Sequence, residues 1–323
     1  SATEIADFVD TGIPPVRGMG SSIGIDNPPL TIYLMSLPVL LSRDPLVVTA
    51  FVAMLNVVAV WGSYELGRRY WCAEVGLVSA ALLAVGPWAV FYSRKVWAQD
   101  LLLPGTLLFF CCLLAWLVEG RRWALSGAIV TLAALTQIHF SALAFIPLLL
   151  LVLAIALGRH LFHRATGKGP AGAEATFPWK PLAVGVAASA LLYAPYFIFD
   201  ALIDWRNVRT FIEVLGTPSQ TYWESVRYAL LNVGGREIHA LAGSEQFRHF
   251  LAGIVDLGYW PDRIEEGAAV AGVIYLIYRW CRKRQDPQAF RRDGLLLLWL
   301  LAPPRFYLRS RSAVCPHYLL PLY

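Results

Sequence analysis

Long apolar stretches separated by short polar junctions constrain the fold of this chain more than any other feature. A helix that crosses a bilayer needs about 20 mainly apolar residues. The chain is 57% hydrophobic and 15% charged, whereas soluble domains are about half apolar and about a quarter charged. We therefore predict an all-α polytopic membrane protein with about 8 visible transmembrane helices. The expected spans are residues 46–66, 74–91, 101–118, 123–138, 140–158, 181–200, 267–281 and 294–308.

Lys and Arg gather at every second junction between the expected spans. These cations are Arg68, Arg69, Arg121, Arg122, Arg159, Arg164, Lys168, Lys180, Arg279, Arg282, Lys283, Arg284, Arg291 and Arg292. Short cytoplasmic loops carry an excess of Lys and Arg, so we assign this side to the cytoplasm. The other, outer side then receives residues 1–45, 92–100, the turn near His139, 201–266 and 309–317, with most of the acidic residues.

The expected spans divide the chain into four parts. These are a first outer loop (1–45), a transmembrane bundle (46–200), a long outer loop (201–266) and C-terminal transmembrane helices (267–323). Residues 30–42 are apolar but too short to span, and a span there would reverse the charge bias, so we expect an interfacial helix. Short interfacial helices are also expected in the long outer loop. Because the chain starts without Met and stops inside an apolar run, we expect a longer natural protein.

Several function classes lack their sequence signatures. No phosphate-binding glycine loop, zinc-protease motif or nucleophile elbow occurs in a suitable context. The 5 cysteines have no metal-ligand spacing, and the net charge of +5 is modest and follows the cytoplasmic junctions. We therefore predict no metal site, no required cofactor and no nucleic-acid partner, and leave open whether a divalent cation assists.

The junction Tyr92-Ser93-Arg94-Lys95-Val96-Trp97-Ala98-Gln99-Asp100 places charges beside the membrane on the outer side. Charged groups at membrane depth usually have a partner or a role. Arg94 or Lys95 could bind a phosphate, with Tyr92 contacting the substrate and Asp100 fixing the arginine or contacting the substrate. The alternative is that Arg94 and Lys95 are cations that extend from the interface into water.

Three further polar groups are expected on the outer side. Glu4 and Asp7 lie on one helix face, where a carboxylate could accept an acceptor's proton, although a solvated face is the alternative. His139 follows an expected span and could contact substrate, or simply form hydrogen bonds at the interface. Near the C-terminus, Arg309, Arg311 and His317 are candidates for a second group that contacts the phosphate, and Tyr318 is a candidate for a substrate contact. The alternative for all four is a purely structural role.

Three segments together resemble a family, the GT-C membrane glycosyltransferases of the family 39 type. These enzymes include the protein O-mannosyltransferases and the aminoarabinose transferase of lipid A. Residues 18–33 look like the end of their first outer loop. Tyr92-Ser93-Arg94 with Asp100 is similar to their "SR…D" segment, and the stretch from His317 to Tyr323 is similar to their "HYLLPLYP" stretch.

The resemblance implies transfer of a sugar from a polyprenyl-phosphate donor to a lipid or protein acceptor, with inversion at the sugar carbon. It implies a GT-C fold in the bacterial plasma membrane, with the active site on the non-cytoplasmic face. The family's acidic pair would fall just before Ser1, so Glu4 and Asp7 are carried as stand-ins beside Asp100. Arg94, together with Arg309 or Arg311, would stabilise the leaving phosphate.

Two other functions stay open at this point. The chain could be a non-catalytic accessory subunit of a larger membrane complex, which predicts contacts with other membrane subunits and no open cavity. A transporter would need broken helices and ionisable groups near mid-membrane, and the expected spans hold few such charges.

Overall fold

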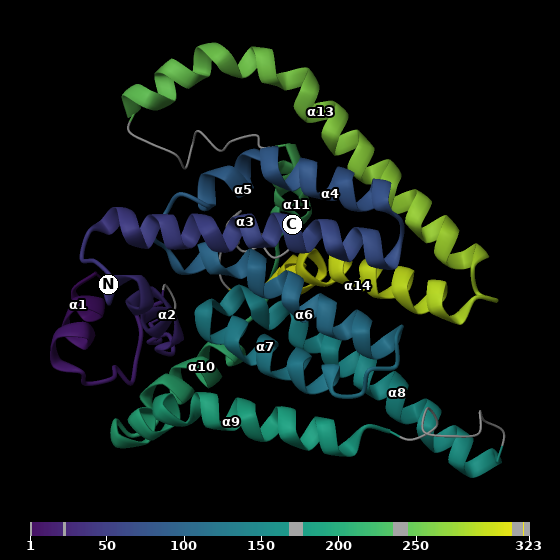
Figure 1. Ribbon diagram of the computed structural model, residues 1–323, viewed down its shortest axis with the longest axis horizontal. Helices are drawn as coiled ribbons and strands as arrows, with labels where there is room; N and C mark the ends of the chain where they lie inside the picture. The colour runs from purple at the N-terminus through teal and green to yellow at the C-terminus, as the bar shows by residue number, and fades with distance from the viewer. Residues whose placement is uncertain (1, 22–23, 168–176, 235–244, 312–318, 320–323) are drawn as a thin grey trace.

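The computed structural model describes residues 2–21, 24–167, 177–234, 245–311 and 319, and for residues 2–3 and 245–262 it describes the backbone only. The described chain is a bundle of helices with one small two-stranded sheet (Figure 1). The helices are α1 (Ala2–Thr11), α2 (Leu30–Val39), α3 (Pro45–Tyr70), α4 (Ala73–Val85), α5 (Pro87–Tyr92), η1 (Ala98–Leu101), α6 (Leu102–Leu117), α7 (Ala124–Ile138), η2 (Phe140–Phe145), α8 (Ile146–Thr166), α9 (Trp179–Leu202), α10 (Arg206–Gly216), α11 (Glu224–Gly234), α13 (Glu245–Arg282) and α14 (Pro287–Leu308). The strands are β1 (Gln220–Thr221) and β2 (Arg309–Ser310), which pair antiparallel.

The prediction of an all-α polytopic membrane protein is confirmed, but the count of about 8 spans is not. In the described residues, four helical segments are long and apolar enough to cross a membrane: Pro45–Tyr70, Ala98–Leu117, Phe140–Thr166 and Trp179–Leu202. Residues 74–91, expected as one span, are divided at Gly86-Pro87 into α4 and α5. Helix α7 has 15 residues, fewer than a span of ordinary length.

The starts of two N-terminal helices follow local chemistry that is visible in the sequence. Helix α3 begins at Pro45, where a proline costs no hydrogen bond, and the Asp44 side chain accepts a hydrogen bond from the Leu46 N–H at 2.9 Å. Helix α2 begins directly after Pro29. The short helix that the sequence predicts in the first loop is present as α2.

Helix α6 is the centre of the bundle, because most of its residues are buried, whereas most residues of the peripheral helix α9 are not. Phe110 on α6 stacks on Trp299 of α14 with ring centroids 3.9 Å apart, and Phe145 packs edge-on against Phe110. Figure 1 shows α6 with α3 on one side and α7 on the other. Membrane helices associate through such close packing, because lipid gives them little hydrophobic drive.

Basic junctions meet at one end of the bundle, on the right in Figure 1. Arg69 at the end of α3 and Arg121 before α7 both pair with Glu119, at 2.6 and 2.8 Å. Arg292 of α14 donates to the Tyr70 carbonyl at 2.5 Å. The junctions after α3 and α6 therefore lie beside the start of α14, as the charge pattern predicts. That this end faces the cytoplasm stays a prediction.

The contact between α3 and α4 depends on two glycines. A Cβ added at Gly76 would lie 2.5 Å from the Tyr64 carbonyl oxygen, and one added at Gly67 would lie 2.6 Å from the Gly76 Cα. We expect Gly76→Ala to lower the free energy of unfolding by about 1–3 kcal/mol, because the two backbones must move apart. Thermal unfolding of the detergent-purified protein measures this loss.

Gly62→Ala is the matched control for this prediction. Gly62 lies inside α3 as Gly76 lies inside α4, so both substitutions change helix propensity alike. Nothing lies within 4 Å of a Cβ added at Gly62. Equal stability of the two variants would show that the α3–α4 contact does not need a glycine.

Candidate functional site

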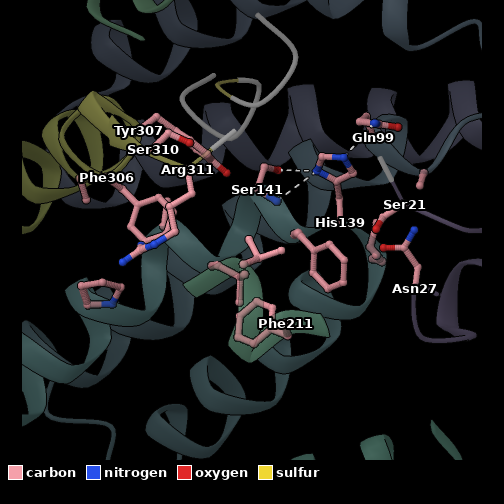
Figure 2. A pocket seen from close by; sticks show the side chains of 18 of the residues that line it. Ser21, Asn27, Gln99, His139, Ser141, Phe211, Phe306, Tyr307, Ser310 and Arg311 are labelled. Carbon is pink, nitrogen blue, oxygen red and sulfur yellow. Dashed lines mark hydrogen bonds between the residues drawn. The ribbon is translucent and has the colours of Figure 1, made fainter. Parts of the chain in front are cut away.

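A cavity of about 920 Å³ lies at the end of the bundle opposite the basic junctions. Helix α7 runs from that basic end towards the cavity and ends at Ile138. The cavity is lined by loop residues of the first segment (Met19, Gly20, Ser21, Asn27) and by the turn Trp97–Gln99. It is also lined by the last residue of α7 with the three that follow it (138–141), the start of α8, α10 and the end of α14 with β2. Figure 2 shows these parts converging, with Phe211 of α10 across the cavity from Arg311.

His139 is fixed in the cavity wall by two neighbours (Figure 2). The backbone N–H of Ser141 donates to His139 Nδ1 at 3.1 Å, and the Ser141 hydroxyl lies 2.8 Å from the same nitrogen. Nδ1 is therefore the unprotonated nitrogen of the neutral ring, and Nε2–H faces the Gln99 side chain at 3.0 Å. With the amide assigned so that its oxygen faces the ring, Gln99 accepts a hydrogen bond from this N–H.

Three arginines form the cationic rim of the cavity: Arg305 in the last turn of α14, Arg309 in β2 and Arg311 directly after β2. The pairing of Thr221 with Arg309 and of Gln220 with Ser310 holds this segment, and Arg311 Nε donates to the Thr217 carbonyl at 3.1 Å. The side chains of Arg305 and Arg309 are exposed and make no hydrogen bond or ion pair within the described part of the chain.

The lining has a cationic rim and an apolar floor. Among the described residues, no Asp or Glu lines the cavity. The floor is made by side chains of α8 and α14, among them Leu148, Leu151, Leu298 and Ala302. Three guanidinium groups above such a floor suit an anionic head, for which arginine offers bidentate hydrogen bonds, joined to an apolar tail.

The first loop reaches this cavity because Asp26 anchors it to α9 and α10. The Asp26 carboxylate pairs with Arg206 at 3.0 Å and with Arg17 at 3.3 Å. Its N–H donates to the Asn207 side chain at 3.0 Å, and its carbonyl accepts from the Tyr196 hydroxyl at 2.8 Å. The segment with the family resemblance therefore supplies the Ser21 and Asn27 side chains to the wall.

The structure brings together some of the predicted site residues and leaves others apart. His139, Arg309 and Arg311 line the cavity, but Glu4, Asp7, Tyr92, Arg94, Lys95 and Asp100 do not. His317 and Tyr318 lie outside the described residues. Arg305, Ser21, Asn27 and Phe211 line the cavity and were not predicted. Roles in catalysis or binding stay predictions for every one of these residues.

The turn from residue 92 to 100 is an aromatic cluster with one exposed cation. Tyr92 is 5% exposed and stacks between Trp88 and Trp97, with centroids 6.0 and 5.9 Å away. The Lys95 ammonium lies 3.6 Å from the Phe91 ring centroid, a cation–π contact. Burial lowers the pKa of Lys95, while the negative charge of Asp100 opposes this shift. Arg94 is exposed and has no partner in the described residues.

Asp100 organises this turn from within. It is 1% exposed, and its Oδ2 accepts a hydrogen bond from the Trp97 N–H at 2.8 Å. The Asn56 side chain of α3 donates to the Asp100 carbonyl at 3.1 Å. Through the hydrogen bond at Oδ2, Asp100 holds Trp97, which lines the cavity.

The predicted acidic residues of the first loop lie on α1, away from the cavity lining. Asp7 is exposed and Glu4 is half-buried. Asp10, one turn further, pairs with Arg43 and so ties α1 to the turn before α3. In the described residues, no group of three or more His, Cys, Asp or Glu could hold a metal ion.

Comparison with known proteins gives two matches. A family model described as dolichyl-phosphate-mannose-protein mannosyltransferase matches residues 26–172. The fold matches the crystal structure of ArnT from Cupriavidus metallidurans in the apo state, with a TM-score of 0.56 and 15% sequence identity over 99% of this chain. The chain spans 51% of that protein, about half its length. No curated protein matches. The resemblance to GT-C membrane glycosyltransferases is confirmed in the fold and over residues 26–172.

Proposed function

We propose that this chain is part of a GT-C glycosyltransferase that transfers a sugar from a polyprenyl-phosphate donor to an acceptor at the non-cytoplasmic face of the membrane. The observation that carries this proposal is the arginine-rimmed cavity above an apolar floor. A polyprenyl-phosphate sugar has the same division, with an anionic phosphate next to a long apolar tail. The matched family is named for a lipid-phosphate mannose, which supports this class of donor.

The proposed reaction is an inverting displacement at the sugar carbon. An acceptor hydroxyl or amine attacks the anomeric carbon, the bond from that carbon to the phosphate oxygen breaks, and the phosphate leaves with the electron pair. Arg305, Arg309 and Arg311 stabilise the negative charge that develops on the leaving group. The acceptor's proton goes to a carboxylate base, for which we propose the acidic pair that the resemblance places before Ser1.

Around the reacting atoms, His139 has a positioning role in this proposal. Hydrogen bonds to Ser141 and Gln99 fix the orientation of its ring, so the ring presents a rigid surface that orients a bound sugar. The floor along α8 and α14 receives the prenyl chain, which keeps the phosphate at the rim. The alternative of an accessory subunit predicted no open cavity, and the cavity of about 920 Å³ argues against it.

The donor class is tested with the complete natural protein in proteoliposomes and two radiolabelled donors of the same sugar. One donor is the polyprenyl-phosphate sugar and the other is the nucleotide sugar. We expect label to reach a lipid or protein acceptor from the lipid donor only, because the described chain has no nucleotide-binding loop and the apolar floor fits a prenyl chain. Transfer from the nucleotide sugar, or no transfer from any of several polyprenyl-phosphate sugars, would overturn the proposal.

A further inference from the structure

A second cavity, of about 1220 Å³, lies at the basic end of the bundle. It is bounded by the ends of α6 and α8, Phe177 and Pro178, the last part of α13 and the first half of α14. Leu151 and Leu298 line both this cavity and the outer one, so α8 and α14 form a wall common to the two. We call this second cavity the basic groove.

The cations of the basic groove include two arginines that pair with no carboxylate in the described chain, Arg122 and Arg159. Arg122 donates to the Phe177 carbonyl at 3.2 Å, and its Nε is buried without a partner. The Arg159 side chain is exposed and makes no hydrogen bond or ion pair with the residues that the structure describes. Phe177 keeps the two near each other, because its N–H donates to Nδ1 of His160, the residue after Arg159, at 3.3 Å.

The acidic residues of the groove are already engaged. Glu119 pairs with Arg69 and Arg121 and accepts from the Tyr70 hydroxyl at 2.7 Å. Asp286 caps α14 by accepting from the Gln288 and Ala289 N–H groups, each at 3.1 Å. The charge of Arg122 and Arg159 is therefore available to an anion from outside the chain.

Below the cations, the walls of the groove are aliphatic. Val152 and Ala156 of α8 face the groove together with Leu297 of α14, and the exposed side chains Ile155 and Leu301 add apolar surface. The cavity therefore combines a cationic mouth, at the end that the charge pattern assigns to the cytoplasm, with an interior that acyl chains can fill without loss of hydrogen bonds.

We propose that the basic groove binds an anionic phospholipid of the cytoplasmic leaflet, with its phosphate between Arg122 and Arg159 and its acyl chains along α8 and α14. The cytoplasmic leaflet is the negatively charged one, and basic pockets between transmembrane helices on that side bind anionic headgroups. This site is separate from the outer cavity and does not depend on the proposed transferase function.

Native mass spectrometry of the delipidated complete protein tests this proposal. The protein is titrated with phosphatidylglycerol, phosphatidylcholine and the water-soluble headgroup glycerol phosphate. We expect one phosphatidylglycerol to bind preferentially. Arg122→Gln with Arg159→Gln should weaken it about 30-fold, because each cation near a membrane surface contributes about 1 kcal/mol and 1.4 kcal/mol is a factor of ten.

Two further variants show whether the lipid binds in the groove itself and not to positive charge elsewhere on the protein. Arg164→Gln removes an exposed cation of the same helix that does not line the groove, and should leave binding unchanged. Ala156→Trp fills the groove without changing charge, and should abolish binding. Equal binding of the two lipids, unchanged binding in the double variant, or equally tight binding of glycerol phosphate would overturn the proposal. So would the absence of any bound lipid because another segment of the natural protein fills the groove.

Discussion

Arg309→Ala is expected to lower the rate of sugar transfer from a polyprenyl-phosphate donor by about 100- to 1,000-fold, the usual loss when one group that stabilises developing charge is removed. The Arg309 side chain lines the outer cavity and has no hydrogen bond or ion pair within the described chain, so truncating it to Ala should not disturb the fold. The effect should fall on kcat more than on KM, because the leaving phosphate gains charge only as the bond breaks. Single-turnover transfer in proteoliposomes measures it.

Arg94→Ala is the control that decides between two cationic sites. Arg94 is also exposed and unpaired in the described chain, but it lies outside the cavity lining. We expect Arg94→Ala to keep nearly the full rate, and Arg309→Lys to recover part of the loss because it restores the charge without the planar fork. A large loss of transfer rate in Arg94→Ala, with no loss in Arg309→Ala, would indicate that the donor phosphate binds at the turn of residues 92–100.

The helices could be predicted because apolar length and cap chemistry are local properties. Pro45 after Asp44 marks the start of α3 in the sequence and in the structure. The division of residues 74–91 was missed, although Gly86-Pro87 is a strong signal for a break. Apolar composition alone does not distinguish one continuous helix from two joined at such a pair.

The candidate site was only partly predictable, because it is made by segments far apart in the chain. The charge pattern placed His139, Arg309 and Arg311 on one side, and they line one cavity. It could not show that Lys95 would contact the Phe91 ring, since that contact depends on how the turn folds. Arg305 was missed because residues 294–308 were treated as an apolar span, whereas α14 continues through Pro303-Pro304 and carries Arg305 to the rim.

A cluster of three charges at the basic end should dominate the stability of the C-terminal helices. Asp293 of α14 is fully buried and accepts from Arg279 of α13 at 2.5 Å and from Arg292 Nε at 2.9 Å. Arg292 in turn reaches the Tyr70 carbonyl of α3 and lies 5.2 Å from the Trp71 ring centroid. One carboxylate therefore holds together the ends of three helices.

Asp293→Asn is expected to lower the free energy of unfolding by about 3–5 kcal/mol, because it leaves two largely buried guanidinium groups without their counter-charge. Reversible unfolding in mixed lipid–detergent micelles, followed by tryptophan fluorescence, measures the change.

Asp286→Asn makes the same substitution at the exposed N-cap of the same helix and should cost no more than about 0.5 kcal/mol, since Asn caps as well as Asp. If Asp293→Asn were as stable as Asp286→Asn, the buried carboxylate would contribute only a hydrogen bond that an amide can replace. The double variant Asp293→Asn with Arg279→Gln shows whether unbalanced charge is the cause. If it is more stable than Asp293→Asn alone, the stability lost in the single variant comes from unpaired charge, because the second substitution removes one of the two cations that the first leaves unpaired.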